Sequence, residues 1–111
     1  MRRGAFNDPG YFAHRVTLQE RVVTADGLGG SAPGWADRAT LWSRVVPMTQ
    51  AEAARADHLT SRITHEVSIR FREDIASGMR FLHRGRVLAI LSKLDPDESR
   101  RFLIVLCEEV A

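Results

Sequence analysis

The sequence predicts a mainly β protein: a small antiparallel β-barrel or sandwich with one short helix in a long connection between strands. Apolar and polar residues alternate through most of the chain, which is the pattern of half-buried strands. Clusters of glycine, proline, aspartate and serine separate these segments at short intervals, as turns do. A single alanine-rich segment has helical composition. Short strands joined by turns are typical of small barrels and sandwiches.

Length and composition favour one ordinary globular domain. The chain has 111 residues, of which 44% are hydrophobic and 27% charged, with a formal net charge of +2. Its single cysteine, Cys107, excludes an intramolecular disulfide framework and a multi-cysteine zinc site, so we expect a reducing compartment. No apolar run approaches the roughly 20 residues that span a bilayer, and we expect neither membrane association nor a signal peptide.

The first part of the chain predicts an arm followed by two strands. We expect residues 1–13 to form a flexible arm and residues 14–111 to form one barrel domain. Tyr11 and Phe12 follow a Pro-Gly turn in this arm, which is either a disordered terminus or a docking segment with aromatic anchors. Alternation predicts strands over residues 14–22 and 35–47, with a flexible glycine-rich loop over residues 24–34 between them.

The only plausible helix covers residues 49–59, "TQAEAARADHL". Thr49 and Glu52 have the spacing of a capping box, in which each side chain satisfies a backbone N–H group at the helix start. About ten residues without a strong apolar stripe make a marginal helix. It lies within residues 47–62, the longest connection that the pattern predicts.

The second half of the chain predicts three further strand regions. In "THEVSIRFR", His65, Val67, Ile69 and Phe71 alternate with polar residues. Residues 80–94 predict a hairpin with "HRGR" at its tip, where we expect His83 to be solvated. Residues 101–110 form a nearly continuous apolar strand, which predicts burial on both faces, against the core and against a neighbouring element or subunit.

A search for chemistry finds no catalytic or metal-binding set, and we expect neither an enzyme nor a cofactor. No two histidines have the spacing of a helical metal site. His65 on an apolar strand face indicates a buried imidazole hydrogen-bonded to backbone. Cys107 in an apolar strand indicates an inert core thiol. Glu108 and Glu109 are adjacent, so they point to opposite strand faces and cannot act as a carboxylate pair.

The charge distribution leaves two binding hypotheses open. Residues 62–86 carry six arginines against three acidic residues, and the end of the chain is acidic. Arg70 and Arg72 with Glu108 and Glu109 are therefore candidate interface residues for head-to-tail self-association. Alternatively, Phe71 between Arg70 and Arg72 fits a small barrel that binds single-stranded oligonucleotides, in which aromatic and basic residues interleave.

The order of several segments resembles one known family. "HRVTLQ", a glycine-rich loop, "WADRATLWSRVVP", "THEVSIRFR", "IASGMRF", "GRVLAI" and "LIVLCEEV" follow one another over residues 14–110 as in phage head–tail joining proteins, also called head-closure or stopper proteins. The chain differs in its longer N-terminal lead and in Arg38 and Val46. The segments from Trp42 to Pro47 and from Thr64 to Arg70 carry much of the likeness.

The resemblance implies a non-enzymatic β-barrel subunit in the neck of a tailed phage or a phage-like gene transfer agent. Such a subunit would form a six- or twelve-fold ring between the portal–adaptor complex and the tail terminator or tail tube, and would retain packaged double-stranded DNA. It would lie in the neck of the particle and be assembled in the bacterial cytoplasm. Another neck or tail-completion component remains an alternative.

The resemblance also makes the long connection the candidate gate of the DNA channel. A surface loop with a packed helix is the other interpretation of the same segment. The candidate gating residues are Thr49, Gln50, Glu52, Arg55, Asp57, His58 and Leu59.

Overall fold

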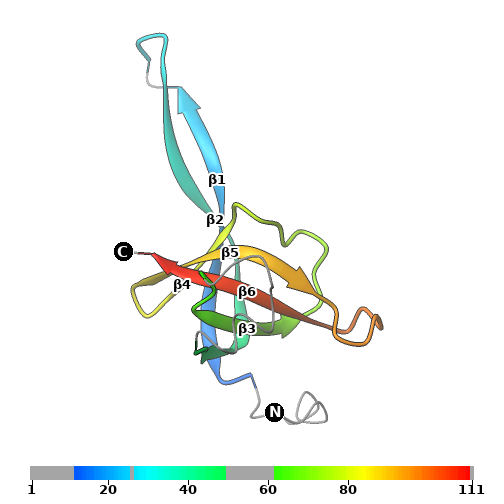
Figure 1. The fold of residues 1–111 in the computed structure, drawn as a ribbon. Coiled ribbons are helices and arrows are strands. Elements are labelled where there is room, and N and C mark those ends of the chain that lie inside the picture. Colours follow the sequence, from blue (N-terminus) through cyan, green and yellow to red (C-terminus); the bar gives the residue numbers. More distant parts are fainter. Residues whose placement is uncertain (1–11, 26, 50–61, 111) are drawn as a thin grey trace.

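The computed structural model describes residues 12–25, 27–49 and 62–110. These residues form six antiparallel strands in one closed barrel, with the order β1-β2-β3-β6-β5-β4, so the predicted mainly β class is confirmed (Figure 1). The predicted helix over residues 49–59 lies outside the described residues except for Thr49. The strands are β1 (His14–Ala25), β2 (Ser31–Pro47), β3 (His65–Arg70), β4 (Arg80–His83), β5 (Arg86–Leu94) and β6 (Phe102–Val110).

The barrel encloses one apolar core, because inward-facing residues alternate along each strand. Phe81 from β4 is fully buried among side chains from all the neighbouring strands. The core residues that the barrel encloses are Val16, Leu18, Val67, Ile69, Ile75, Phe81, Leu88, Ile90, Leu103, Val105 and Cys107.

Strand β6 is buried on both faces, as the continuous apolar run predicts. Leu103, Val105 and Cys107 point into the barrel. Ile104 and Leu106 point outward into a second cluster, where Ile63 is buried and Met48 and Leu91 pack against it. The outer face is therefore covered by neighbouring elements of the same chain.

The β1–β2 hairpin extends far beyond the barrel. Beyond Gln19, β1 pairs with β2 alone, and β2 pairs with β3 only from Ser43 onward. Residues 20–25 and 27–36, which we call the hairpin arm, therefore form a two-stranded ribbon that projects from the barrel (Figure 1). The fold accordingly measures 53 × 29 × 26 Å along its principal axes.

The hairpin arm corrects the prediction of a flexible loop over residues 24–34. Strand β1 continues to Ala25 and β2 begins at Ser31, so the described connection is only a few residues long. Even Pro33 and Gly34 pair with Val23 and Val22 across the ribbon. Proline is compatible with this position because the ribbon has an open edge that needs no donor.

The β4–β5 hairpin has the predicted tip, but His83 is buried rather than solvated. Its side chain is only 6% exposed. His83 is the last residue of β4 and lies two positions after the core residue Phe81, so the two side chains share the inward face. The turn itself consists of Arg84 and Gly85, both with positive φ, as two-residue hairpins require.

Candidate interaction surfaces

The predicted interface residues do not form one cluster. Arg70 is exposed at the end of β3, opposite Phe102 of β6, whereas Glu109 lies seven residues further along β6. At about 3.3 Å per residue, the two charges are about 23 Å apart along the strand. The basic and acidic groups therefore occupy opposite ends of the same strand pair.

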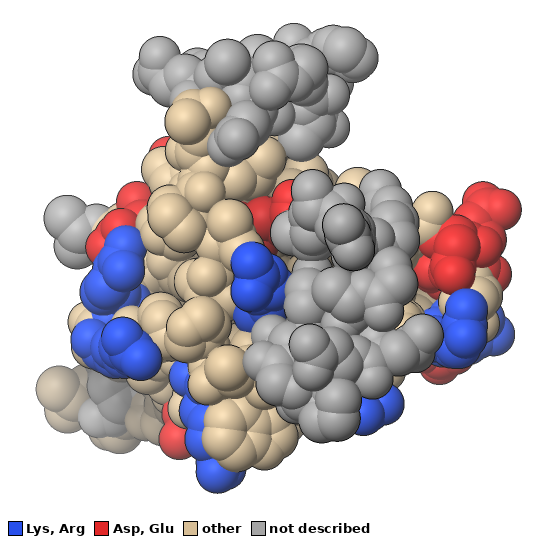
Figure 2. Space-filling model, turned by 90° about the horizontal axis from the view of Figure 1, so that it is seen from below, with Lys and Arg blue, Asp and Glu red and all other residues tan. Residues whose placement is uncertain are grey.

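Two of the four predicted interface charges, Arg72 and Glu109, already form ion pairs. Arg86 binds Glu109 through two hydrogen bonds of 2.6 and 2.9 Å, and this pairing lowers the pKa of Glu109. Glu108 is half-buried. Figure 2 likewise shows acidic and basic side chains beside each other at the end that carries the β5–β6 turn, and uncharged surface between the blue groups elsewhere on that face. The residues coloured in this view therefore do not form one large patch of a single charge sign.

Of the two aromatic residues in the predicted N-terminal arm, Tyr11 lies outside the described residues. The ring of Phe12 packs on Phe102, with centroids 5.8 Å apart and planes tilted by 38°. The chain thus enters β1 from a point fixed against the start of β6.

His65 is a buried structural group, as predicted, but its partners are side chains rather than backbone. Its Nδ1 lies 2.9 Å from Thr64 Oγ1, and its Nε2 lies 3.1 Å from a guanidinium nitrogen of Arg86. The guanidinium can only donate, so Nε2 accepts and Nδ1 carries the proton. Burial, followed by the positive charge of Arg86, lowers the pKa of His65. A neutral imidazole used in this way is a fixed cross-link between β3 and β5.

Two further histidines, His14 and His83, form a pair of imidazole rings where β1 meets β4. The rings of His14 and His83 meet edge to face with centroids 5.4 Å apart, and Val45 donates its backbone N–H to His14 Nδ1 over 3.3 Å. Burial, then His83 and the nearby arginines Arg84 and Arg44, lower the pKa of His14. The neutral state of the His14 ring is thus favoured.

Cys107 behaves as the inert thiol that the sequence predicts. It is fully buried in the barrel, and burial raises its pKa to about 12. Within the described ranges, no three histidine, cysteine or acidic residues gather in a way that could hold a metal ion. No helix among these residues is long and apolar enough to cross a membrane.

A network of charged and aromatic side chains fixes the base of the hairpin arm. Asp74 accepts two hydrogen bonds from Arg72, at 2.9 and 2.8 Å, and one from Arg38, at 2.9 Å. These bonds hold the pKa of Asp74 well below its usual range. Arg38 also reaches Glu20 of β1 at 3.0 Å. The Arg38–Asp74 bond therefore joins the base of the arm to the segment after β3, and Arg72 holds Asp74 in place for it.

A second contact set holds the other side of the same base. Gln19 donates to Asp37 over 2.7 Å and accepts from Arg80 over 2.8 Å. The guanidinium of Arg80 lies 4.1 Å from the ring centre of Trp35. The ribbon therefore leaves the barrel in a fixed direction.

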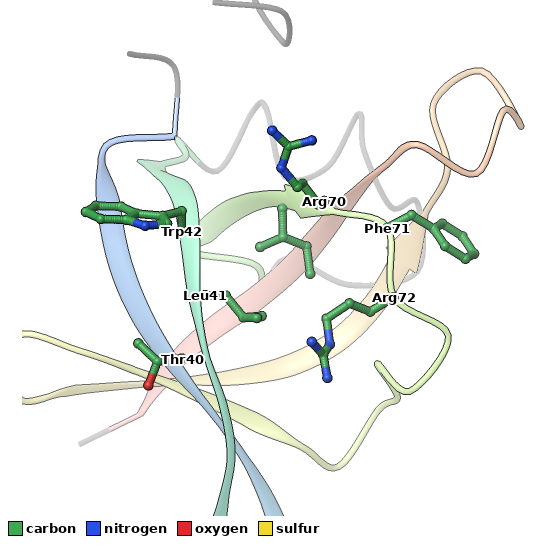
Figure 3. A pocket seen from close by; sticks show the side chains of 7 residues that line it. Thr40, Leu41, Trp42, Arg70, Phe71 and Arg72 are labelled. Atoms are coloured by element: carbon green, nitrogen blue, oxygen red, sulfur yellow. The ribbon is translucent and has the colours of Figure 1, made fainter. Parts of the chain in front are cut away.

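The barrel wall opens into a pocket where β2 and β3 separate. Their pairing stops at Ser43 and Ile69, and beyond this point the strands diverge. The pocket has a volume of about 270 Å³. Figure 3 shows lining side chains from β2 on one side and from the end of β3 and the following segment on the other. The lining residues are Thr40, Leu41, Trp42, Ile69, Arg70, Phe71 and Arg72.

Aromatic rings and arginines make up the rim of this pocket. Trp42 is 55% exposed, and the guanidinium of Arg15 lies 4.9 Å from its ring centre. Arg100 lies 5.1 Å from the ring centre of Phe71. Arg70 forms no ion pair with any residue that the structure describes. Arg72 is paired with Asp74 and Arg100 with Glu73, so the pocket combines an apolar floor with a rim whose positive charges are partly neutralised.

Sequence reasoning found part of this site. The alternation around Phe71 singled out Arg70 and Arg72, but nothing local in the sequence connects them with Trp42. The proximity of Trp42 to Arg70 and Arg72 depends on the register between β2 and β3 and on where their pairing stops. The projecting arm was missed because its glycines indicated a loop.

The gating residues are described at one position only. Thr49 is exposed just after β2, and residues 50–59, which include Gln50, Glu52, Arg55, Asp57, His58 and Leu59, lie outside the described residues. The two ends of the connection are joined by a hydrogen bond of 2.8 Å from Met48 N–H to the Thr64 carbonyl.

Fold and surfaces together define a small closed β-barrel with a projecting hairpin, a structural module that offers contact surfaces. Residues 8–110 match the family model of the phage head completion protein. The chain belongs to this family, and it is a structural component of a phage head or neck and so of a virion-type particle.

Three individual proteins are similar to the chain in sequence or in fold. The chain is 28% identical over 80 residues to the head completion protein gp16 of Bacillus phage SPP1, covering 72% of this chain and 73% of that protein. It is 32% identical to protein SF1141 from Shigella flexneri 2a, known from a solution structure, with a TM-score of 0.77 and coverage of 94% and 97% of the two chains. A chain of a native gene transfer agent virion shares the fold, with 21% identity, a TM-score of 0.56 and coverage of 86% and 93%.

Proposed function

We propose that this protein is the neck connector of a tailed phage or phage-like gene transfer agent, forming a six- or twelve-fold ring between the portal–adaptor complex and the tail. Family membership over residues 8–110 is the observation that carries the proposal. In this role the ring retains packaged double-stranded DNA and offers a docking surface to the tail terminator or tail tube. The subunits assemble on the particle in the bacterial cytoplasm.

The connection between β2 and β3 is the candidate gate in this ring. Its two ends are held side by side by the Met48–Thr64 hydrogen bond, and Met48 and Ile63 pack against Ile104 and Leu106 of β6. An anchored stem supports a gate, because a segment displaced by passing DNA must return to the same place afterwards. Thr49 and the residues up to Leu59 supply the closing segment in this proposal.

Shortening the connection tests the gate. Replacing residues 50–60 with a short Gly-Ser linker leaves the stem contacts in place. We expect filled heads to lose DNA before a tail attaches, measured as nuclease-sensitive DNA per particle. Heads that keep their DNA as well as wild-type heads would contradict the gate, and absence of this chain from the neck density of purified particles would contradict the neck role itself.

The pocket also favours a second candidate function, binding of single-stranded oligonucleotides. Trp42 and Phe71 are aromatic, and Arg15 and Arg70 lie beside them, as does Arg100, which is also paired with Glu73. Stacking on such rings combined with phosphate pairing is how small barrels hold single strands. A gel shift at two salt concentrations separates the candidates, because phosphate contacts weaken steeply with salt.

A further inference from the structure

The outer face of β4, β5 and β6 carries a row of apolar side chains. Leu82, Val87 and Val110 lie opposite one another across these three neighbouring strands. They alternate with core residues such as Phe81 and Leu88, so their side chains point away from the barrel interior. Neither apolar cluster of the fold includes them, and Val110 is 39% exposed. Outward faces of antiparallel sheets are usually polar, so this row, which we call the outer patch, indicates a contact surface.

One face of the hairpin arm is apolar as well. Val23, which is 67% exposed, lies opposite Pro33, and Trp35 lies opposite Arg21. Residues two positions apart on a strand share a face, so these four residues form one surface, which we call the arm face. The guanidinium of Arg80 lies 4.1 Å from the ring centre of Trp35 and holds that ring at the base. A two-stranded ribbon has no second layer of its own to cover such a face.

The two surfaces cannot meet within one copy. In the barrel β4 lies next to β1 and β5 next to β4, so the outer patch is centred two strands away from the base of the arm. The ribbon projects away from the barrel wall (Figure 1). Hydrogen bonds from Arg38 to Asp74 and from Gln19 to Asp37 fix the direction of its base. The arm face is therefore open to a second copy, whereas the outer patch of its own copy is out of reach.

The charges beside the two surfaces are opposite and equally spaced. Arg21 precedes Val23 by two residues on β1, and Glu108 precedes Val110 by two residues on β6. Two residues span about 6.6 Å along a strand, so Arg21 comes to Glu108 when Val23 lies over Val110. Neither charge forms an ion pair with another residue that the structure describes. The arm face and the outer patch therefore match in both apolar and charged groups.

We infer that the arm face of one copy packs on the outer patch of the next copy, with Val23 against Val110 and Arg21 paired with Glu108. This contact uses two different surfaces of the chain, so it is heterologous, and it closes into a ring when the rotation between copies allows closure. The inference deepens the proposed ring and rests on it for the biological setting, although the contact itself is a property of the chain.

Site-directed cross-linking measures this contact in the full chain. When Val23 lies over the outer patch, Ala25 lies two residues further on, over the β4–β5 turn that contains Arg84. A short bis-maleimide is therefore expected to join Ala25→Cys/Arg84→Cys chains into dimers and higher ladders, in concentrated purified protein or in particles. The matched control, Ala25→Cys/Glu98→Cys, is expected to stay monomeric, because it moves the second thiol to the β5–β6 turn, again at a residue with positive φ. The native thiol of Cys107 is buried and stays silent.

Charge reversal in the cross-linking background tests the ion pair. Arg21→Glu and Glu108→Arg are each expected to reduce the ladder at least about tenfold, because like charges then face each other. An equimolar mixture of the two variants is expected to restore the ladder, since each arm then meets an opposite charge on the other variant. Arg70→Glu, the same reversal at another exposed arginine, is expected to leave the ladder unchanged. A mixture that does not recover would overturn the pairing of Arg21 with Glu108.

A second pair of variants tests which face of the arm is used. Val23→Ser is expected to reduce the ladder about tenfold, because it removes an apolar side chain that the contact buries. Val22→Ser, on the opposite face of the same strand, is expected to leave it unchanged. Equal losses in the two variants would overturn the assignment of the arm face.

The outcomes separate the inference from the proposed function. A ladder in either setting supports the docking contact, even if particles lack this chain and the neck role fails. No ladder above the control in both settings overturns the docking contact, even if the chain is present in the particle neck. Dimers without larger products would overturn the head-to-tail arrangement, and cross-links to a different particle protein without any ladder would overturn the second copy as the occupant.

Discussion

The barrel and the hairpin arm are stabilised in different ways. Phe81, Leu18 and Val105 are fully buried in the barrel, whereas Val23 and Leu28 of the arm are 67% and 91% exposed. The barrel therefore derives its stability from removing apolar surface from water, and the arm depends on strand pairing and on a charged clamp at its base. The difference teaches that the exposed side chains of Val23 and Leu28 add little to the stability of the chain itself.

The largest expected effect comes from opening the barrel core. Phe81→Ala removes a fully buried ring and is expected to lower the free energy of unfolding by about 3–5 kcal/mol, measured by urea denaturation. Leu28→Ala in the arm, as the matched apolar truncation, is expected to stay within about 0.5 kcal/mol of wild type. Comparable losses at both positions would remove the distinction between barrel and arm.

Acidification is expected to weaken the barrel and spare the arm. The folded state lowers the pKa of His14 and of His65 below the usual 6.5, so the unfolded chain binds more protons than the folded one as pH falls past 6.5. The contribution of these neutral rings is complete above pH 6.5 and declines below it.

Urea midpoints between pH 7.5 and 5.5 measure this effect. The midpoint is expected to fall in wild type, and the fall is expected to be shallower in His14→Asn. After correction for the slower intrinsic exchange at low pH, the protection factors of core amides should fall at pH 5.5, while those of the described arm, which has no histidine, stay unchanged. A midpoint that rises on acidification would contradict the assignment of neutral rings.

The clamp at the base of the arm predicts a smaller and local effect. Asp74→Asn removes the charge that Arg38 and Arg72 share, and is expected to cost about 1 kcal/mol because the groups are partly exposed. Amides of residues 20–25 are expected to exchange faster, with those around Val105 unchanged. Glu98→Gln, a charge change on the far turn, serves as the control. Uniform acceleration across the barrel would show that the clamp supports the whole fold.

The smallest effect is expected at the β4–β5 turn. Arg84 has a φ of +52°, in the left-handed region where asparagine is more favourable than arginine. Arg84→Asn is expected to stabilise the barrel by about 0.5 kcal/mol, seen as a small rise in the thermal midpoint. Arg21→Asn, an exposed strand position of the arm, is expected to give no gain, and a gain there of equal size would attribute the effect to charge.

Local patterns predicted the barrel class and most strands because inward and outward residues alternate. The burial of His83 was predictable because it lies two residues after Phe81 and so on the same face of the strand. The turn residues beside it led to the opposite expectation. The length of the arm was not predictable from the glycine-rich stretch alone, because its strands are ordered by pairing with each other. The pocket depends on register and strand divergence, which no short segment encodes.

The closure of the barrel has a kinetic consequence. Strand β1 joins β4 through only three residue pairs, between Thr17–Gln19 and Arg80–Leu82, more than sixty residues apart in the chain. Hairpins such as β4–β5 can form early from local contacts, whereas this seam must wait until the intervening chain has been organised. We therefore expect folding on the millisecond-to-second scale that is typical of non-local β topologies. The pairing between β1 and β4 is expected to form last and to open first in local unfolding.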